Sequence, residues 1–131
     1  MRKLEPFREF LEVAAQSNGT ILNASRIARQ IGSDVKTVQS YFRILEDTWV
    51  GFLLPAYHNS VRKSQASHPK FYFFDPGVKR ALERSLDAVP IPGSFAYGEA
   101  FEHLVILEFH RLNEYLGRDY RLSYLRTKDG A

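Results

Sequence analysis

The sequence predicts a mostly helical α+β protein, because three kinds of segment follow one another along its 131 residues. Three stretches before residue 50 repeat apolar residues at the three- and four-residue steps of amphipathic helices. Two β-type runs joined by polar residues come next. A long apolar helix and one strand-like run come last. With 44% hydrophobic and 14% aromatic residues, the chain has enough apolar material to form a core.

The first three helices are predicted from their apolar stripes and their end signals. Apolar residues on one stripe predict the first helix, and these are Phe7, Phe10, Leu11 and Ala14. Asn23 caps a second helix, which ends at Gly32. A third helix begins near Ser33 or Asp34. Its apolar stripe consists of Val35, Val38, Phe42, Leu45 and Trp49.

The middle of the chain predicts a β-hairpin and a capped helix. The extended runs are residues 50–57 and 70–74, and the polar residues 59–68 form a loop with a basic tip. Asp75 caps a helix that runs to about Leu86, with Pro76 in its first turn. Prolines and a glycine then mark a boundary, which divides the chain into a domain over 1–88 and a segment over 89–131.

The segment after the boundary contains a helix, from about Tyr97 to Leu116, and a strand over 120–125, with a turn signal at 127–131. The helix is apolar around much of its circumference. One helix and one strand cannot complete a sheet domain. We therefore expect an incomplete domain that buries its apolar surface elsewhere, for example against a second copy of the chain.

The second and third helices have the spacing of a helix-turn-helix. The small Ala28 lets the helices approach closely, and Gly32, four residues on, supplies the turn. Val35 and Val38 are expected to fill the angle between the helices. Three helices followed by a hairpin with a basic tip predict a winged helix.

Charge suggests a nucleic-acid partner for this domain. Lys and Arg exceed Asp and Glu by nine to four between residues 21 and 80, whereas Asp and Glu exceed Lys and Arg by eleven to nine in the remainder. The expected DNA-binding residues lie opposite the apolar stripe of the third helix and at the hairpin tip: Ser33, Lys36, Thr37, Ser40, Arg43, Arg62 and Lys63. Winged helices also serve as protein-interaction modules, so a protein interface is the alternative.

Evidence for catalysis is weak. The chain has no cysteine, no phosphate-binding Gly-Lys-Ser/Thr loop and no Gly-x-Ser-x-Gly elbow. Glu99, His103 and His110 suggest metal ligands, but a Glu/His pair one turn apart is more often a surface pair. No apolar run has the length of a membrane helix or of a signal peptide, so we expect a cytoplasmic protein without a membrane partner.

Several stretches, in order along nearly the whole chain, carry a family resemblance. They are Asn23-Ala24-Ser25-Arg26-Ile27-Ala28, Thr37-Val38-Gln39-Ser40-Tyr41, Leu45-Glu46, Leu53-Leu54-Pro55-Ala56-Tyr57, Pro69-Lys70-Phe71-Tyr72-Phe73-Phe74-Asp75-Pro76-Gly77, Phe101-Glu102 and Tyr124-Leu125-Arg126-Thr127. Together they resemble the domain of unknown function that follows the nucleotide-binding module in a large group of prokaryotic AAA+ superfamily ATPases.

The resemblance implies a winged helix followed by a restriction-endonuclease-like fold, in which Glu102 matches a helical Glu of the family. The chain stops at Ala131, where the strand with the Glu-Val-Asp signature should begin, so the nuclease-like segment is expected to be incomplete and inactive. The ATPase motifs would precede Met1, so ATP and magnesium belong to the parent ATPase and no cofactor or metal is expected in this chain. We therefore expect a non-catalytic module. Its expected partners are duplex DNA, bound weakly and with salt dependence, the ATPase module of the same protein, and a second copy.

Overall fold

The computed structural model describes residues 4–126, with the backbone alone at 64–66, and has an α+β fold in which about half of the chain is helical. The elements in order are α1 (Leu4–Gln16), α2 (Ala24–Gln30), α3 (Val35–Asp47), β1 (Gly51–Leu54), α4 (Val61–Ala66), β2 (Lys70–Phe73), α5 (Pro76–Leu82) and α6 (Phe95–Tyr115). Thr127 and the turn expected at 127–131 lie outside the described residues.

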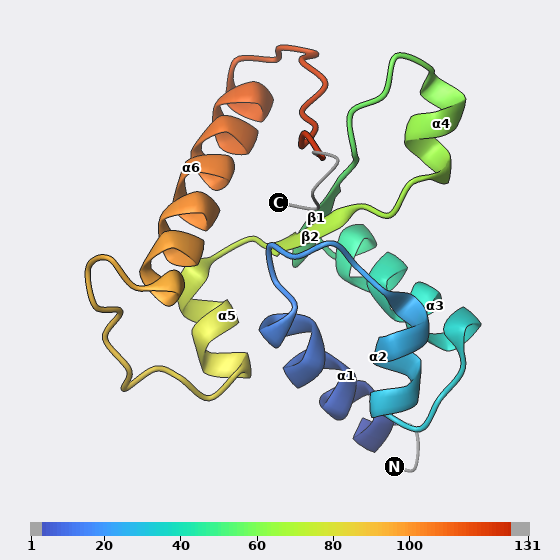
Figure 1. Ribbon diagram of the computed structural model, residues 1–131, viewed down its shortest axis with the longest axis vertical. Coiled ribbons are helices and arrows are strands. Elements are labelled where there is room, and N and C mark those ends of the chain that lie inside the picture. Colours follow the sequence, from blue (N-terminus) through green and yellow to red (C-terminus); the bar gives the residue numbers. More distant parts are fainter. Residues whose placement is uncertain (1–3, 127–131) are drawn as a thin grey trace.

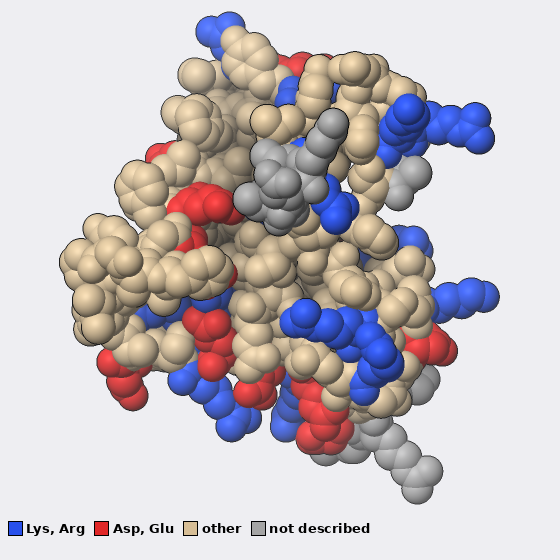
Figure 2. Space-filling view, in the orientation of Figure 1, with Lys and Arg blue, Asp and Glu red and all other residues tan. Residues whose placement is uncertain are grey.

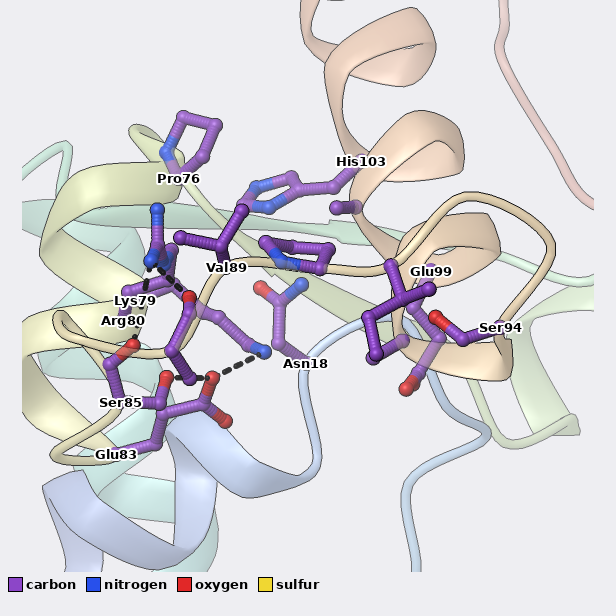
Figure 3. Close-up of a pocket in the computed structure, with 15 residues that line it drawn as sticks. Asn18, Pro76, Lys79, Arg80, Glu83, Ser85, Val89, Ser94, Glu99 and His103 are labelled. Atoms are coloured by element: carbon purple, nitrogen blue, oxygen red, sulfur yellow. Dashed lines mark hydrogen bonds and ion pairs between the residues drawn. The ribbon is translucent and has the colours of Figure 1, made fainter.

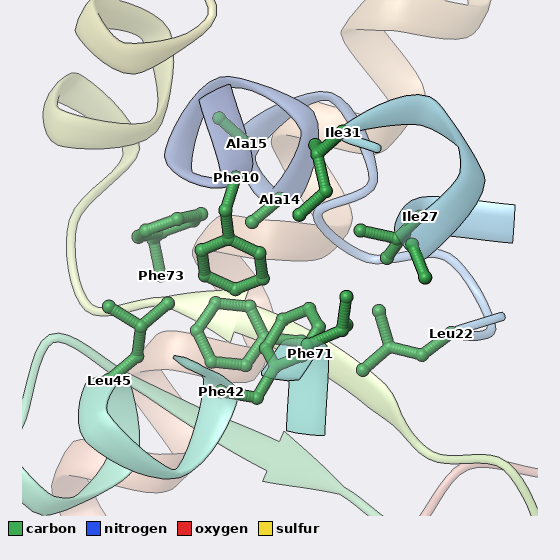
Figure 4. Close-up of a cluster of buried hydrophobic side chains, with 12 residues drawn as sticks. Phe10, Ala14, Ala15, Leu22, Ile27, Ile31, Phe42, Leu45, Phe71 and Phe73 are labelled. Atoms are coloured by element: carbon green, nitrogen blue, oxygen red, sulfur yellow. The ribbon is translucent and has the colours of Figure 1, made fainter. Parts of the chain in front are cut away.

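Helices α1 to α3 and one face of the β-hairpin share the main core (Figures 1 and 4). Phe42 of α3 is its centre, because its ring contacts Phe10 of α1 at 4.8 Å and Phe71 of β2 at 5.1 Å between ring centroids. The fully buried Val38 lies on the same stripe of α3. The predicted succession of three helices is therefore confirmed. The predicted burial of the apolar stripes is confirmed at Phe10, Val38 and Phe42.

Two predicted members of the apolar side of α3, Val35 and Trp49, are exposed instead. Val35 is 36% exposed, so Val38 alone of the two valines fills the angle between α2 and α3. Trp49 lies beyond the end of α3, is 78% exposed and has a φ of 63°. The backbone N–H of Val50 bonds to the carbonyl of Leu45, which closes the helix and turns Trp49 away from the stripe.

Strands β1 and β2 form a two-stranded antiparallel sheet in which Gly51 pairs with Phe73 and Leu54 pairs with Lys70. The predicted hairpin is confirmed, with shorter strands than expected. The connection was expected to be a loop, but it contains the short helix α4. The Ser60 hydroxyl accepts the Lys63 N–H at the start of α4, and the Ser67 hydroxyl donates to the Lys63 carbonyl at its end.

The outer edge of β2 is covered by segments that are distant in sequence. The backbone N–H of Gly19 donates to the carbonyl of Phe71 at 2.8 Å. Phe73 is bonded twice: its N–H donates to Oδ1 of Asn18 at 2.8 Å, and its carbonyl accepts from Nε2 of His103 at 2.7 Å. Both side chains are buried. Asn18 and His103 therefore join the α1–α2 connection and α6 to the sheet.

Helix α5 begins as predicted, with Asp75 as its cap and Pro76 in its first turn, but it ends at Leu82 rather than near Leu86. The residue Arg84 has a φ of 60°. The N–H of Ser85 bonds back to the carbonyl of Arg80 at 2.8 Å. This backbone turn stops the helix before the proline-containing segment.

The strand expected at 120–125 does not form as a strand. Tyr124 makes a single parallel bridge to Ala56, with Tyr124 N–H donating to the Pro55 carbonyl and Tyr57 N–H donating to the Tyr124 carbonyl. Helix α6 buries His103 and Leu107 against the sheet, but its remaining surface is largely apolar and exposed. The exposed apolar residues of α6 include Phe101, Leu104, Val105, Phe109 and Leu112. Within residues 4–126, no helix is long and apolar enough to cross a membrane.

Candidate nucleic-acid interface

The turn between α2 and α3 fixes the orientation of the predicted DNA-binding helix. Gly32 has a φ of 64°, a backbone conformation that favours glycine. The N–H of the next residue, Ser33, donates to the carbonyl of Ala28 at 2.9 Å. Asp34 then caps α3 by accepting the backbone N–H of Thr37 at 2.7 Å. Local signals at three consecutive residues therefore position the start of α3, as expected.

The side of α3 opposite the core presents a stripe of two cations and one hydroxyl, Lys36, Ser40 and Arg43, which we call the α3 stripe. All three are exposed. They lie roughly 180° around the helix from Val38 and Leu45, because each residue advances the helix by about 100°. The other two contacts predicted here, Ser33 in the turn before α3 and Thr37 in its first turn, are half-buried. The α3 stripe is therefore the part of the prediction that is best placed to meet a ligand.

Helix α2 adds two cations that the sequence prediction omitted. Arg26 and Arg29 are exposed, whereas Ile27 and Ala28 between them are buried. The helical periodicity used for α3 would have identified both arginines if applied to α2. Figure 2 shows Lys and Arg side chains over α2.

The remaining predicted contacts, Arg62 and Lys63, lie on α4 at the end of the hairpin and are exposed. In Figure 1, α4 and the α2–α3 turn both lie toward the right-hand edge of the molecule. Figure 2 places cations near both elements, while Asp and Glu alternate with Lys and Arg over α1 and α5. In this view the right-hand side therefore shows more cations than acidic groups, whereas α1 and α5 carry both signs.

The cations of α2, α3 and α4 are free of ion pairs within the described part of the chain, since the ion pairs found there involve other cations. Three acidic groups reduce the positive potential at α3: Asp34 at its start, and Glu46 and Asp47 at its end. The hydrogen bond from the Thr37 N–H lowers the pKa of Asp34, which keeps this carboxylate charged. Burial raises the pKa of Glu46 near the other end of α3.

The two histidines of the weaker metal hypothesis, His103 and His110, make unrelated contacts. His103 donates to the Phe73 carbonyl, and the His110 ring stacks on Phe52 with centroids 4.0 Å apart. No group of three His, Asp or Glu side chains is positioned to hold a metal ion anywhere in residues 4–126. Glu102, the match to the nuclease-family Glu, accepts a 2.5 Å hydrogen bond from the Tyr72 hydroxyl. The described donors therefore do not fit a nuclease metal site.

The fold and the site define a class of protein: a small α+β domain in which three helices and a two-stranded sheet share the main core, with the exposed α3 stripe on its third helix. A family model described as a domain of unknown function, DUF8612, matches residues 1–88. The chain belongs to this family. No curated protein and no solved structure matches the chain.

Proposed function

We propose that residues 1–88 form a winged helix-turn-helix domain that binds duplex DNA weakly and with little sequence preference. The α3 stripe enters the groove, while Arg62 and Lys63 contact the phosphate backbone. One observation carries the proposal: Lys36 and Arg43 project from α3 directly opposite its buried face and have no ion-pair partner in the described residues.

The small number of cations sets the expected strength. If about three or four phosphates are neutralised, log K falls with log salt at a slope of roughly −3 to −4, from about 0.9 per phosphate. Asp34, at the start of the same helix, remains charged and opposes closer phosphate contact. Weak binding that decreases steeply with salt is therefore expected.

The test is a fluorescence-anisotropy titration of the full chain against a random-sequence duplex at several salt concentrations. The Lys36→Ala/Arg43→Ala double variant should bind more weakly and should keep its fold, because both side chains are exposed. Arg118→Ala/Arg121→Ala removes the same charge from exposed positions outside residues 1–88 and is the matched control. No binding at low salt, salt-independent binding, or equal effects of the two double variants would refute the proposal.

We further propose that the chain is a non-catalytic part of the C-terminal region of an AAA+-type ATPase, with the ATPase module as an intramolecular partner. The ground for this step is the ordered resemblance along the sequence, which places residues 89–131 at the start of a nuclease-like fold. Nuclease and ATPase assays on the purified chain test this step, and activity of either kind would contradict it.

A second candidate function is self-association or partner binding through α6. The observation that favours it is the apolar surface of this helix, on which Phe101 is 60% and Phe109 is 57% exposed. Apolar patches of this kind commonly mark protein interfaces. Sedimentation of the full chain beside a Phe101→Ser/Phe109→Ser variant tests it. A dimer that dissociates in the variant supports self-association, whereas two monomers of equal solubility exclude it.

A further inference from the structure

The side of α6 that faces away from the sheet is apolar along the whole helix. The buried His103 and Leu107 lie on the other side, where Glu99 and His103 also line a cavity beside α5 (Figure 3). Because each residue advances the helix by about 100°, the exposed apolar residues fall within an arc of about 140° opposite His103. We call these residues the α6 stripe: Tyr97, Phe101, Leu104, Val105, Phe109, Leu112, Tyr115 and Leu116. A helix with one face on a core normally presents polar side chains on this side, so the α6 stripe indicates a second packing partner.

The α6 stripe is large enough for a protein interface. Helix α6 has 21 residues and is therefore about 31 Å long. Phe101, Phe109 and Tyr115 are 60%, 57% and 87% exposed. An aromatic side chain buries about 150–250 Å² when it is covered, so these three rings alone offer roughly 300–500 Å². A standard interface buries about 800 Å² on each partner, and the other residues of the stripe supply much of the remainder.

A groove of about 640 Å³ extends the apolar surface along one flank of the stripe. Phe101 and Val105 belong to one wall of this groove, and residues 122–125 belong to the other. Two charged side chains also line it, but Lys70 and Glu102 are paired with each other at 3.4 Å. The groove therefore suits an apolar side chain of a partner.

Glu108 is the charged residue that lies among the apolar positions of the stripe. Arg111 lies one turn further on, at the edge of the stripe, and the two side chains pair at 3.4 Å. A second α6 helix in the antiparallel orientation brings its own Arg111 beside Glu108, and its Glu108 beside Arg111, when a two-fold axis passes between residues 109 and 110. A parallel copy places each of these groups level with its own like charge, which is unfavourable. The charges therefore favour an antiparallel copy.

We propose that the α6 stripe is a homodimer interface in which the α6 helices of two copies pack antiparallel about this two-fold axis. The inference rests on the self-association proposed above and specifies its orientation and contacts. Leu116 of one copy lies level with Phe101 and Val105 of the other, at the groove. Glu108 and Arg111 form two reciprocal ion pairs across the interface, so the charge within the stripe has a partner when it loses water.

Charge reversal tests the contacts across the axis. The full chain should sediment as a dimer, whereas Glu108→Arg and Arg111→Glu each bring like charges together and should raise the dimer Kd about tenfold or more. An equimolar mixture of the two variants should recover the dimer, because the cation introduced by Glu108→Arg then faces the carboxylate introduced by Arg111→Glu. Within each variant chain the like charges remain side by side, so recovery requires contacts between copies. Glu114→Arg makes the same charge change at an exposed position off the stripe and is the matched control, which should stay dimeric.

Spin-label distances test the orientation with the stripe unchanged. This measurement also decides the question if Arg111→Glu is unfolded, since Arg111 donates to the Phe74 carbonyl as well. The chain has no cysteine, so Ala96→Cys and Glu114→Cys each give a single labelling site, and both positions are exposed off the stripe. In the antiparallel dimer the two labels are offset along the helix by about 40 Å at position 96 and by about 14 Å at position 114. A parallel dimer has no offset at either position, so pulsed electron paramagnetic resonance should give a clearly longer distance for Ala96→Cys than for Glu114→Cys.

The outcomes separate this inference from the proposals on which it builds. A parent chain that stays monomeric at every concentration overturns both the antiparallel interface and self-association, and leaves the α6 stripe to a different protein. A dimer that does not recover on mixing of two folded variants, or whose two labels give equal distances, overturns the antiparallel interface alone. None of these results alters the DNA-binding test, because α6 lies outside residues 1–88.

Discussion

At Gly51, the first residue of β1, the structure leaves no room for a side chain. A Cβ atom added there would lie 2.2 Å from Cζ of Phe71, 2.7 Å from Cε2 of the same ring and 2.7 Å from the carbonyl oxygen of Tyr72. Ordinary contacts of this kind begin near 3.4 Å. The Phe71 ring would therefore have to move by about 1 Å to accept even an alanine.

The Phe71 ring cannot make this movement freely. It is fully buried, and its centroid lies 5.1 Å from the rings of both Phe42 and Phe73. Overpacking of a dense core costs about 1–3 kcal/mol, and the backbone oxygen of Tyr72 adds a contact that cannot relax by rotation. We predict that Gly51→Ala lowers the free energy of unfolding by about 2 kcal/mol, a large share of the 5–15 kcal/mol typical of a domain.

Urea denaturation followed by circular dichroism measures this change. With a slope of about 2 kcal/mol per molar, the midpoint should fall by about 1 M in Gly51→Ala. Gly98→Ala is the matched control, because Gly98 lies inside α6 with no atom near its added Cβ, and it should stabilise the protein by about 0.5–1 kcal/mol. An unchanged midpoint in Gly51→Ala would show that the hairpin does not pack on Phe71 as described.

Three further changes test other parts of the fold. Val38→Asp places an unpaired carboxylate at a fully buried position and should abolish the folded circular-dichroism signal; melting within a few degrees of the parent would contradict the helix-turn-helix packing. Asn18→Ala leaves the Phe73 N–H without its acceptor and should cost about 1–3 kcal/mol in urea unfolding, whereas an unchanged midpoint would mean that another group replaces the amide. Burial holds the pKa of His103 below its unfolded value of about 6.5, so the unfolded chain binds more protons between the two values. The contribution of the neutral His103 ring to the free energy of unfolding is complete above about pH 6.5 and is lost as the pH falls toward the folded pKa. His103→Gln should therefore make the free energy of unfolding depend less on pH in this range. An unchanged dependence on pH would refute the assignment.

The sequence alone was sufficient where the controlling interactions are local. Asn23 and Asp75 each accept a backbone N–H three residues ahead, as predicted, and Asp34, one of the two start positions expected for α3, does the same. The periodicity of α3 likewise predicted the burial of Val38 and Phe42. These features depend on residues within one or two turns of helix, so a linear pattern contains them.

Short-range backbone turns explain where the predicted boundaries were wrong. Trp49 continues the apolar spacing of α3, but the hydrogen bond from Val50 to Leu45 ends the helix first and leaves the indole exposed. The polar residues before β2 form a short helix because Ser60 and Ser67 bond the backbone of Lys63. Side-chain and backbone hydrogen bonds therefore override apolar spacing at the ends of elements.

Only the tertiary structure determined the contacts that join distant segments. Nothing near Asn18 or His103 in the sequence indicates that both bond Phe73, since 55 and 30 residues separate them from it. The hydrogen-bonding roles left to Nδ1 of His103 and Nδ2 of Asn18 follow from those two bonds. Tyr124 lies in a run with strand composition, yet a strand requires a backbone partner along its length, and within residues 4–126 the backbone bridge of this run is the one between Tyr124 and Ala56. Local propensity fixes what a segment can form, whereas the long-range hydrogen-bond partners decide what it does form.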